Sequence, residues 1–143
     1  QDPRFALIVL SEIASRALSP AVNDPGTAIG VVGRLVRIMA LWQDTGEHEI
    51  EFKSVFVPAI RPDELLDDAF RPIVRDGAAI SEVQIRLQKA FVALAQVAPL
   101  FAHSAKEIAD DARTSARATL AEWEIQGLED FANDTGNAFR VEE

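Results

Sequence analysis

The chain contains no cysteine. It therefore has no disulfide, no thiolate metal ligand and no cysteine nucleophile, and its cysteine usage does not reveal the redox compartment. No stretch reaches the roughly 18 consecutive apolar residues that a membrane-spanning helix needs, so we expect no transmembrane segment in these residues. Disorder is excluded too, because 48% of the 143 residues are hydrophobic, enough for a sizeable core.

Basic residues are scarce, with 14 Lys and Arg against 23 Asp and Glu and a formal net charge of −9. Nucleic-acid binding depends on clustered Lys and Arg that release counterions, so we expect no nucleic-acid partner. The acidic excess is concentrated in residues 104–143, which carry a net charge of −6. An anionic membrane surface would repel that C-terminal third, so a domain beside a bilayer would face it with the N-terminal half.

Helical periodicity dominates the chain and predicts an all-α fold of about five helices. Pro72 is expected to kink or shorten the third helix, and Gly77 to end it. We expect residues 1–127 to form a single helical domain and residues 128–143 an irregular C-terminal tail, because Asn133 to Asn137 is a turn sequence. The expected helices cover residues 3–18, 25–42, 62–75, 79–97 and 100–126.

One segment departs from the helical pattern. Residues 50–57 are rich in β-branched and aromatic residues and stop at Pro58, which predicts a minor β-strand or a short hairpin. A lone strand leaves backbone groups unpaired, and its partner is a second copy or an upstream segment unless it folds back on itself. We expect a homo-oligomer whose interface includes Ile50, Phe52 and Phe56.

The corner between the first two expected helices is the most specific part of the sequence. Ser19 precedes a proline, which ends the first helix near Leu18. Asp24 precedes Pro25, and this pair predicts an N-cap followed by proline at the first helical position. Each polar residue here has a local structural use, which favours a rigid joint over a ligand site. The residues that could converge on a small ligand are Arg16, Asn23, Asp24 and Thr27.

Glycines follow one side of the second expected helix. Gly26, Gly30 and Gly33 recur at spacings of four and three residues. Each costs roughly 1 kcal/mol of helix propensity relative to alanine. We expect close approach by another helix, the first one, to compensate for this cost.

Catalytic and metal-binding signatures are weak. Neither His48 nor His103 has a carboxylate three residues before it, the Glu-x-x-His spacing of helical di-iron sites, and a metal site needs three or four convergent ligands. Adjacent carboxylates at Asp67-Asp68 and Asp110-Asp111 point about 100° apart on a helix and cannot share an ion. There is no nucleophile elbow and no phosphate-binding loop after a strand. We expect no catalytic residue, no metal and no cofactor, and the balance is against an enzyme.

Three short runs resemble one family. They are Gln1-Asp2-Pro3-Arg4-Phe5, the corner from Ala17 to Ala28, and Val55-Phe56-Val57-Pro58-Ala59. Together they resemble the C-terminal region of an uncharacterised bacterial family of predicted membrane proteins that carries a domain of unknown function. The resemblance implies that the chain is a soluble piece of a longer membrane protein whose hydrophobic spans precede it. It implies no established activity or substrate.

The expected function is therefore an assembly or regulatory module at the C-terminal end of a bacterial membrane protein. We expect it to act through self-association or contact with the membrane-embedded part, on the cytoplasmic side. The alternative is a small-ligand or hydrolytic site at the Asn23-Asp24 corner.

Overall fold

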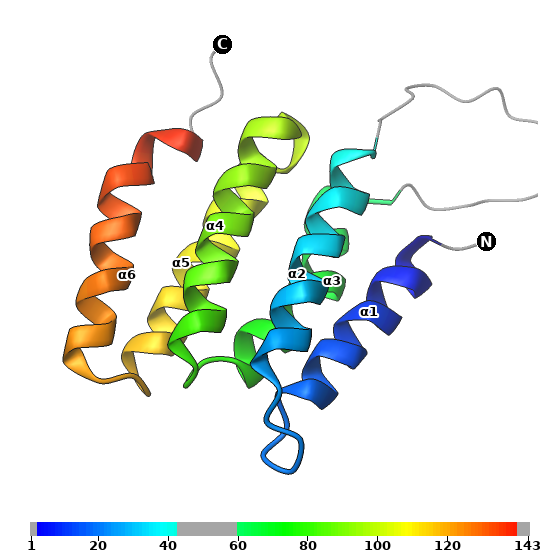
Figure 1. The fold of residues 1–143 in the computed structure, drawn as a ribbon. Coiled ribbons are helices and arrows are strands. Elements are labelled where there is room, and N and C mark those ends of the chain that lie inside the picture. The colour runs from blue at the N-terminus through cyan, green and yellow to red at the C-terminus, as the bar shows by residue number, and fades with distance from the viewer. Residues whose placement is uncertain (1–2, 43–59, 140–143) are drawn as a thin grey trace, which may run out of the picture.

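The computed structural model describes residues 3–42 and 60–139. All regular structure in these ranges is helical, which confirms the all-α class (Figure 1). No helix within them combines the length and the hydrophobicity that crossing a membrane requires. The expected strand, with Ile50, Phe52 and Phe56, lies outside the described residues. The helices are α1 (Pro3–Ala17), α2 (Pro25–Ala40), α3 (Pro62–Asp76), α4 (Ser81–Val97), η1 (Pro99–Phe101), α5 (Ala102–Arg117), α6 (Glu122–Thr135) and η2 (Gly136–Phe139).

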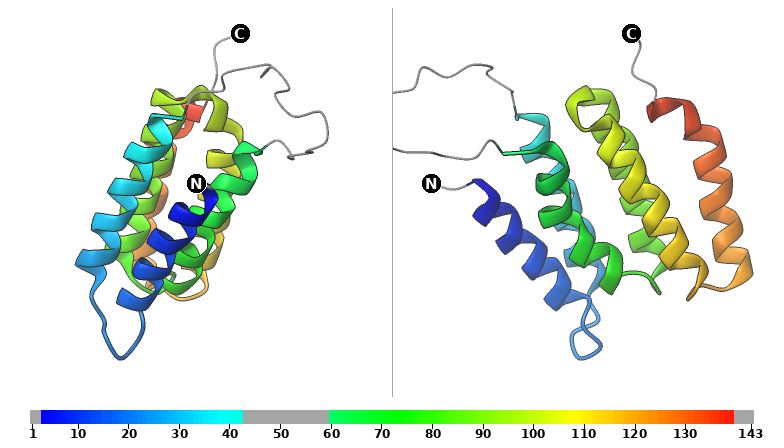
Figure 2. Two further views of the ribbon diagram at one scale, coloured as in Figure 1. Left: turned by 90° about the vertical axis from the view of Figure 1, so that its right-hand side faces the viewer. Right: turned by 180° about the vertical axis from the view of Figure 1, so that it is seen from behind.

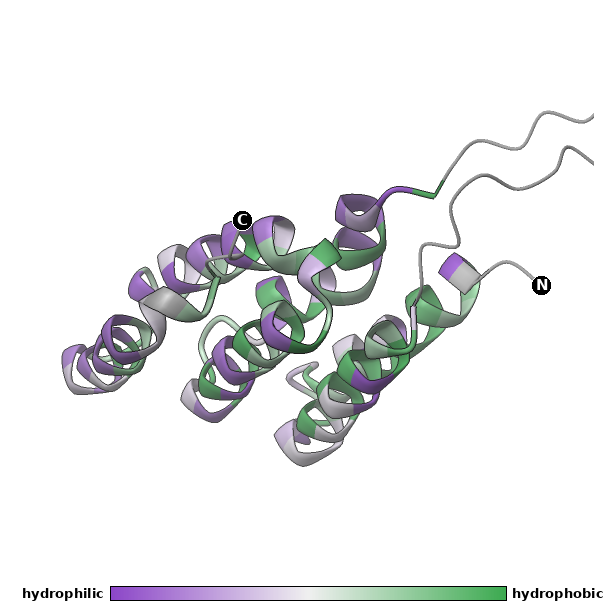
Figure 3. Cartoon of the chain, turned by 90° about the horizontal axis from the view of Figure 1, so that it is seen from above, coloured by the Kyte–Doolittle hydropathy of each residue, from purple (hydrophilic) through white to green (hydrophobic). Residues whose placement is uncertain are grey.

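The helices form two layers closed at each end by a further helix. In Figure 1, α2 and α4 lie side by side in front of α3 and α5, and Figure 2 shows the reverse side. At one end α1 packs against α2 and α3, and at the other α6 packs against α4 and α5. Seen from above, hydrophobic segments of neighbouring helices face one another, and hydrophilic segments lie largely outside (Figure 3).

The core is centred on an aromatic pair between the layers. Phe70 of α3 and Phe91 of α4 are fully buried and meet edge to face, with ring centroids 5.1 Å apart. Burying each such side chain stabilises the fold by roughly 1.5 to 3 kcal/mol. By contrast α6 contributes one buried residue, Leu128. Other large side chains buried in this core are Leu35, Leu65, Leu66, Ile73, Leu87, Leu94, Phe101 and Ile108.

An ion-pair cluster fastens α1 to α3. Arg4 donates through Nη1 to Glu64 at 2.8 Å and through Nε to Asp68 at 2.6 Å. The two carboxylates are four residues apart on α3, so one guanidinium meets both from the same side. This contact fixes the N-terminal end of α1 on the bundle.

The described residues form six α-helices where about five helices were expected, because the expected helix over residues 100–126 is split. α5 ends at Arg117 and α6 begins at Glu122. Between them the Thr119 hydroxyl donates to the carbonyl of Ala78 at 2.8 Å, which ties the break to the corner after α3. No glycine or proline marks the position, so periodicity alone missed it.

The prediction of an irregular tail over residues 128–143 differs from the structure in the first part of that segment, which is helical. α6 runs through Gly127 and on to Thr135, and η2 continues the chain to Phe139. Phe139 is partly buried against the core, and the Thr135 hydroxyl donates to the carbonyl of Phe131 at 2.7 Å. Packing against α4 and α5 therefore keeps this segment helical despite its turn-forming composition.

Pro72 does not shorten α3. The helix continues past it to Asp76, and Gly77 is its C-cap, as expected. A proline here removes one backbone donor from the helix. The next two residues, Ile73 and Val74, are buried, so tertiary packing holds the last turn in place.

Candidate functional site

The corner between α1 and α2 is closed by short-range hydrogen bonds. The Ser19 hydroxyl donates to the carbonyl of Arg16 at 2.8 Å, just after α1 ends. The backbone N–H of Asn23 donates to the Ser19 carbonyl at 2.8 Å, and that of Asp24 to the Ala17 carbonyl at 2.8 Å. These bonds satisfy exposed backbone groups locally and fix the angle at which the chain enters α2.

Asn23 has a conformational role in this corner. Its φ is 48°, in the left-handed region that asparagine tolerates better than most residues. The residue is exposed. Its backbone geometry reverses the chain immediately before the cap of α2.

Asp24 caps α2, which confirms the expectation from the sequence. Its Oδ1 accepts from the backbone N–H of Thr27 at 3.0 Å, and its Oδ2 accepts from the Thr27 hydroxyl at 2.6 Å. The hydroxyl bond, followed by the backbone bond, holds the pKa of Asp24 below its ordinary value of 3.8. Both carboxylate oxygens are therefore already engaged by one residue.

Of the four residues expected to converge here, the structure brings Asp24 and Thr27 into contact. Arg16 lies in the last turn of α1 with its side chain exposed. No hydrogen bond or ion pair joins it to Asp24 or Thr27 among the described residues. A ligand site at this corner stays a prediction, and the geometry itself is that of a rigid joint.

The glycines of α2 do not accommodate α1 as expected. A Cβ at Gly33 would lie 2.9 Å from Nη2 of Arg86, a residue of α4. A Cβ at Gly30 would meet nothing within 4 Å, and one at Gly26 would lie 3.3 Å from the Asp24 carboxylate. Of the three, Gly33 is thus the one that leaves room for a neighbour, and that neighbour is the side chain of Arg86 from α4.

A groove between α3 and α5 was not foreseen from the sequence. Its volume is about 420 Å³. Arg71 lies in it and donates to Asp67 at 2.7 Å and to Asp111 at 2.7 Å. The bond to Asp111 is the main cause that raises the pKa of Arg71. The groove is lined by Arg71, Pro72, Val74, Arg75, Asp111 and Ser115.

The lining of this groove offers no apparatus for nucleophilic catalysis. Ser115 supplies a hydroxyl, but the lining includes no histidine that could act as its base. The charge of Arg71 is already compensated by two carboxylates. The spacing of Asp67 and Arg71 was visible in the sequence, whereas the contribution of Asp111 from another helix was not.

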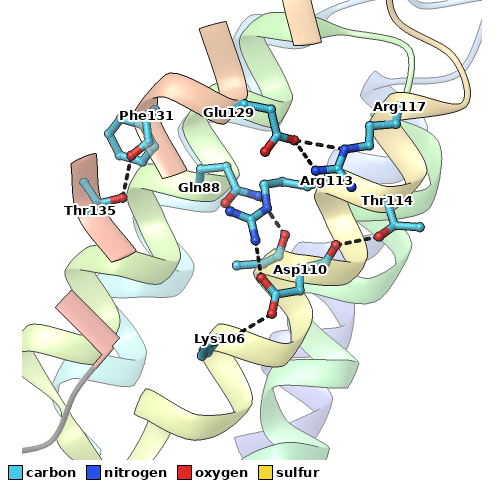
Figure 4. A network of polar contacts seen from close by, with 10 residues as sticks. Gln88, Lys106, Asp110, Arg113, Thr114, Arg117, Glu129, Phe131 and Thr135 are labelled. Carbon is cyan, nitrogen blue, oxygen red and sulfur yellow. Dashed lines mark hydrogen bonds and ion pairs between the residues drawn. The ribbon is translucent and has the colours of Figure 1, made fainter. Parts of the chain in front are cut away.

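Several other titratable groups form structural ion pairs. Asp110 accepts from Lys106 at 2.8 Å and also from Arg113, and Arg117 donates to Glu129 of α6 at 2.7 Å (Figure 4). Nε2 of His103 lies 3.5 Å from Glu107 on the surface of α5. In the ranges that the structure describes, no group of three or more His, Asp or Glu is placed to hold a metal ion.

Comparison with known proteins gives one family. The model of a family described as predicted membrane protein (DUF2254) matches residues 1–93. An uncharacterized protein of Mycobacterium bovis and two of Mycobacterium tuberculosis are each 63% identical to the chain over 35 residues. The matched segment is 24% of this chain and 7% of each relative, so the chain corresponds to a small part of those proteins. No solved structure matches.

Proposed function

We propose that the chain is an assembly module that joins two copies of a longer protein. The premise is that the chain belongs to the family of predicted membrane proteins (DUF2254), whose model matches residues 1–93. The single observation that carries the proposal is an apolar stripe on the outer face of α1. The expected cytoplasmic location and a regulatory role remain predictions.

The stripe lies on the side of α1 that faces away from α2 and α3. It combines Phe5, which is 68% exposed, with Ile13 at 44% and with Ile8 and Val9 at 38% each. The buried face of the same helix holds Leu7, Ala14 and Ala17. A helix that is apolar on both sides is suited to burial between two surfaces, one of which belongs to this bundle.

The spacing within the stripe suits a two-fold partner. Phe5, Val9 and Ile13 are four residues apart and therefore lie along one ridge of the helix. If two α1 helices pack antiparallel about an axis at Val9, Phe5 of one copy faces Ile13 of the other. Such an isologous contact satisfies both copies with the same surface. The stripe is thus its own complement.

The absence of native cysteine makes a cross-linking test clean. Val9→Cys should form a disulfide-linked dimer under mild oxidation, because the axis brings the two positions within the 4.4 to 6.8 Å Cα separation that a disulfide needs. Phe5→Cys and Ile13→Cys should each cross-link poorly alone, and well when the two variants are mixed. Val22→Cys, at an exposed valine of the corner, is the control.

Sedimentation gives the independent readout. The parent chain should sediment as a dimer at micromolar concentration, and Val9→Glu as a monomer with an unchanged helical circular dichroism spectrum. Val22→Glu should remain dimeric. A monomeric parent chain would overturn the proposal and favour contact with the rest of the membrane protein instead. A dimer that survives Val9→Glu would move the interface elsewhere, with the segment containing Ile50, Phe52 and Phe56 as the next candidate.

A further inference from the structure

The layer formed by α2 and α4 carries a charge opposite to that of the whole chain. The two helices hold four basic residues and one acidic residue, a net charge of +3 in a chain whose net charge is −9. They are not neighbours in sequence, and the fold places them side by side (Figure 1). The basic residues are Arg34 and Arg37 of α2 and Arg86 and Lys89 of α4.

These four residues, here called the α2–α4 basic face, differ from the basic residues of α3 and α5 in having no carboxylate partner among the described residues. Each basic residue of α3 and α5 forms an ion pair, as does Arg4 of α1. Among the described residues, no ion pair involves any member of the α2–α4 basic face, and all four side chains are exposed. Arg16 on α1 likewise has no ion-pair partner in the part of the chain that the structure describes.

Arg86 illustrates why the charges of this face are not neutralised within the bundle. Glu82 lies four residues before it on α4, at the spacing of a helical ion pair, yet the two do not pair. Instead Nη2 of Arg86 extends over α2 and lies 2.9 Å from where a Cβ of Gly33 would stand. The missing side chain at Gly33 therefore gives the guanidinium a place against α2, the helix that carries Arg34 and Arg37.

The arrangement has an internal cost. Arg34 with Arg37, and Arg86 with Lys89, are like-charged pairs three residues apart, which destabilise a helix slightly. Neither pair is relieved by a carboxylate within the described residues. An external anionic surface would relieve both pairs at once.

We propose that the α2–α4 basic face docks on the anionic lipid headgroups of the membrane that holds the rest of the protein. The family is one of predicted membrane proteins, so an anionic headgroup layer is the surface that such a module meets. Leu41, 81% exposed and four residues after Arg37, provides an apolar contact on the same side of α2. The proposal does not depend on the association of α1.

The charge distribution favours lipid over nucleic acid. Four exposed basic residues on two neighbouring helices suit a headgroup plane, whereas duplex binding draws on a larger basic surface than a chain of net charge −9 offers. Each basic residue near an anionic surface strengthens binding by roughly five-fold. Removing two of them should therefore weaken binding by about 20- to 30-fold.

The test is co-sedimentation of the full chain with vesicles. Vesicles of phosphatidylcholine with about a third phosphatidylglycerol should bind the chain at low salt and release it in high salt. Vesicles of phosphatidylcholine alone should not bind it. The variant Arg34→Gln/Arg37→Gln should bind anionic vesicles about 20- to 30-fold more weakly than the parent chain. The variant Arg86→Gln/Lys89→Gln should weaken binding to the same extent. The matched control, Lys106→Gln/Arg117→Gln, removes two charges from ion-paired residues of α5 and should bind within about three-fold of the parent chain.

Circular dichroism of every variant separates loss of binding from loss of folding. Equal weakening by the control pair would show that net charge alone governs binding and would overturn the proposal. Equal binding to neutral vesicles, or no binding to anionic ones, would overturn it as well. A DNA duplex that displaces the chain from anionic vesicles at equal phosphate concentration would reassign the face to nucleic acid.

Discussion

The side-chain amide of Gln84 donates to the carbonyl of Gly77 at 3.0 Å, and both residues are buried where α3 gives way to α4. The same carbonyl accepts from the backbone N–H of Ile80 at 3.1 Å. The amide oxygen of Gln84 has no hydrogen-bond partner among the residues that the structure describes. This corner therefore contains one well-satisfied acceptor and one unsatisfied acceptor, and each responds differently to substitution.

Gln84→Met should cost less than about 1 kcal/mol of unfolding free energy, because the Gly77 carbonyl keeps its bond from Ile80 and the unsatisfied oxygen disappears. Gln84→Ala should cost about 2 kcal/mol or more, because it leaves a cavity at a fully buried site. Urea unfolding of both variants measures the difference. A methionine variant as unstable as the alanine variant would show that the amide bond itself holds the corner.

Gly77→Ala should destabilise the protein by about 1 to 3 kcal/mol through overpacking. The new Cβ would lie 2.6 Å from Cγ1 of Val83 and 2.9 Å from the carbonyl oxygen of Ile73. Gly30→Ala is the matched control, since its Cβ would meet nothing within 4 Å. It should stabilise α2 by up to about 1 kcal/mol. Thermal unfolding measures the melting temperatures of both variants. Shifts of the same sign in the two variants would contradict this account.

Asp24→Ala should lower the melting temperature, because the first turn of α2 loses its side-chain cap. Asp24→Asn should retain more stability, since asparagine is also a good N-cap. The lowered pKa of Asp24 means that its contribution is present above pH 3.8 and is lost as the pH falls below that value towards the lowered pKa. The difference in melting temperature between the parent chain and Asp24→Ala should therefore shrink on acidification. A difference independent of pH would remove the charged cap as its cause.

Arg4→Met should destabilise the protein by about 1 kcal/mol, because two partly buried ion pairs are lost while the aliphatic stem keeps its packing. The loss should shrink in high salt, which screens these pairs. Arg75→Met is the control, because that side chain is 73% exposed and pairs with its own neighbour Asp76 in the last turn of α3. Its melting temperature should match that of the parent chain. A salt-independent loss at Arg4 would assign its effect to packing.

The helix boundaries at the α1–α2 corner could be predicted because their causes are local. The proline after Ser19 and the Asp24-Pro25 pair act through their own backbone, and the structure places α1 and α2 within two residues of the expected limits. The break before α6 could not be predicted, since it involves a bond from Thr119 to Ala78, far away in the sequence. Helix boundaries set by neighbouring residues could therefore be predicted, whereas a boundary that depends on a contact between distant segments could not.

The same distinction applies to the candidate sites. The cap between Asp24 and Thr27 follows from adjacent residues. The position of Arg86 over Gly33 depends on which helix approaches the glycines of α2, and the sequence favoured α1 where the structure has a side chain of α4. The spacing of glycines predicts a close approach by another segment, but it does not identify that segment.

The sparse attachment of α6 has a consequence for the ensemble of states in solution. One fully buried leucine, Leu128, the partly buried Phe139 and the ion pair between Arg117 and Glu129 carry much of its contact with the bundle, and Trp123 is 77% exposed. Undocking this segment costs roughly 3 kcal/mol on that basis, well below the roughly 5 to 15 kcal/mol of global unfolding. On the order of one molecule in a hundred then has α6 released at any moment. Amide hydrogens of α6 should therefore exchange with solvent through these local openings, and faster than those of α4, which exchange only when the whole bundle unfolds.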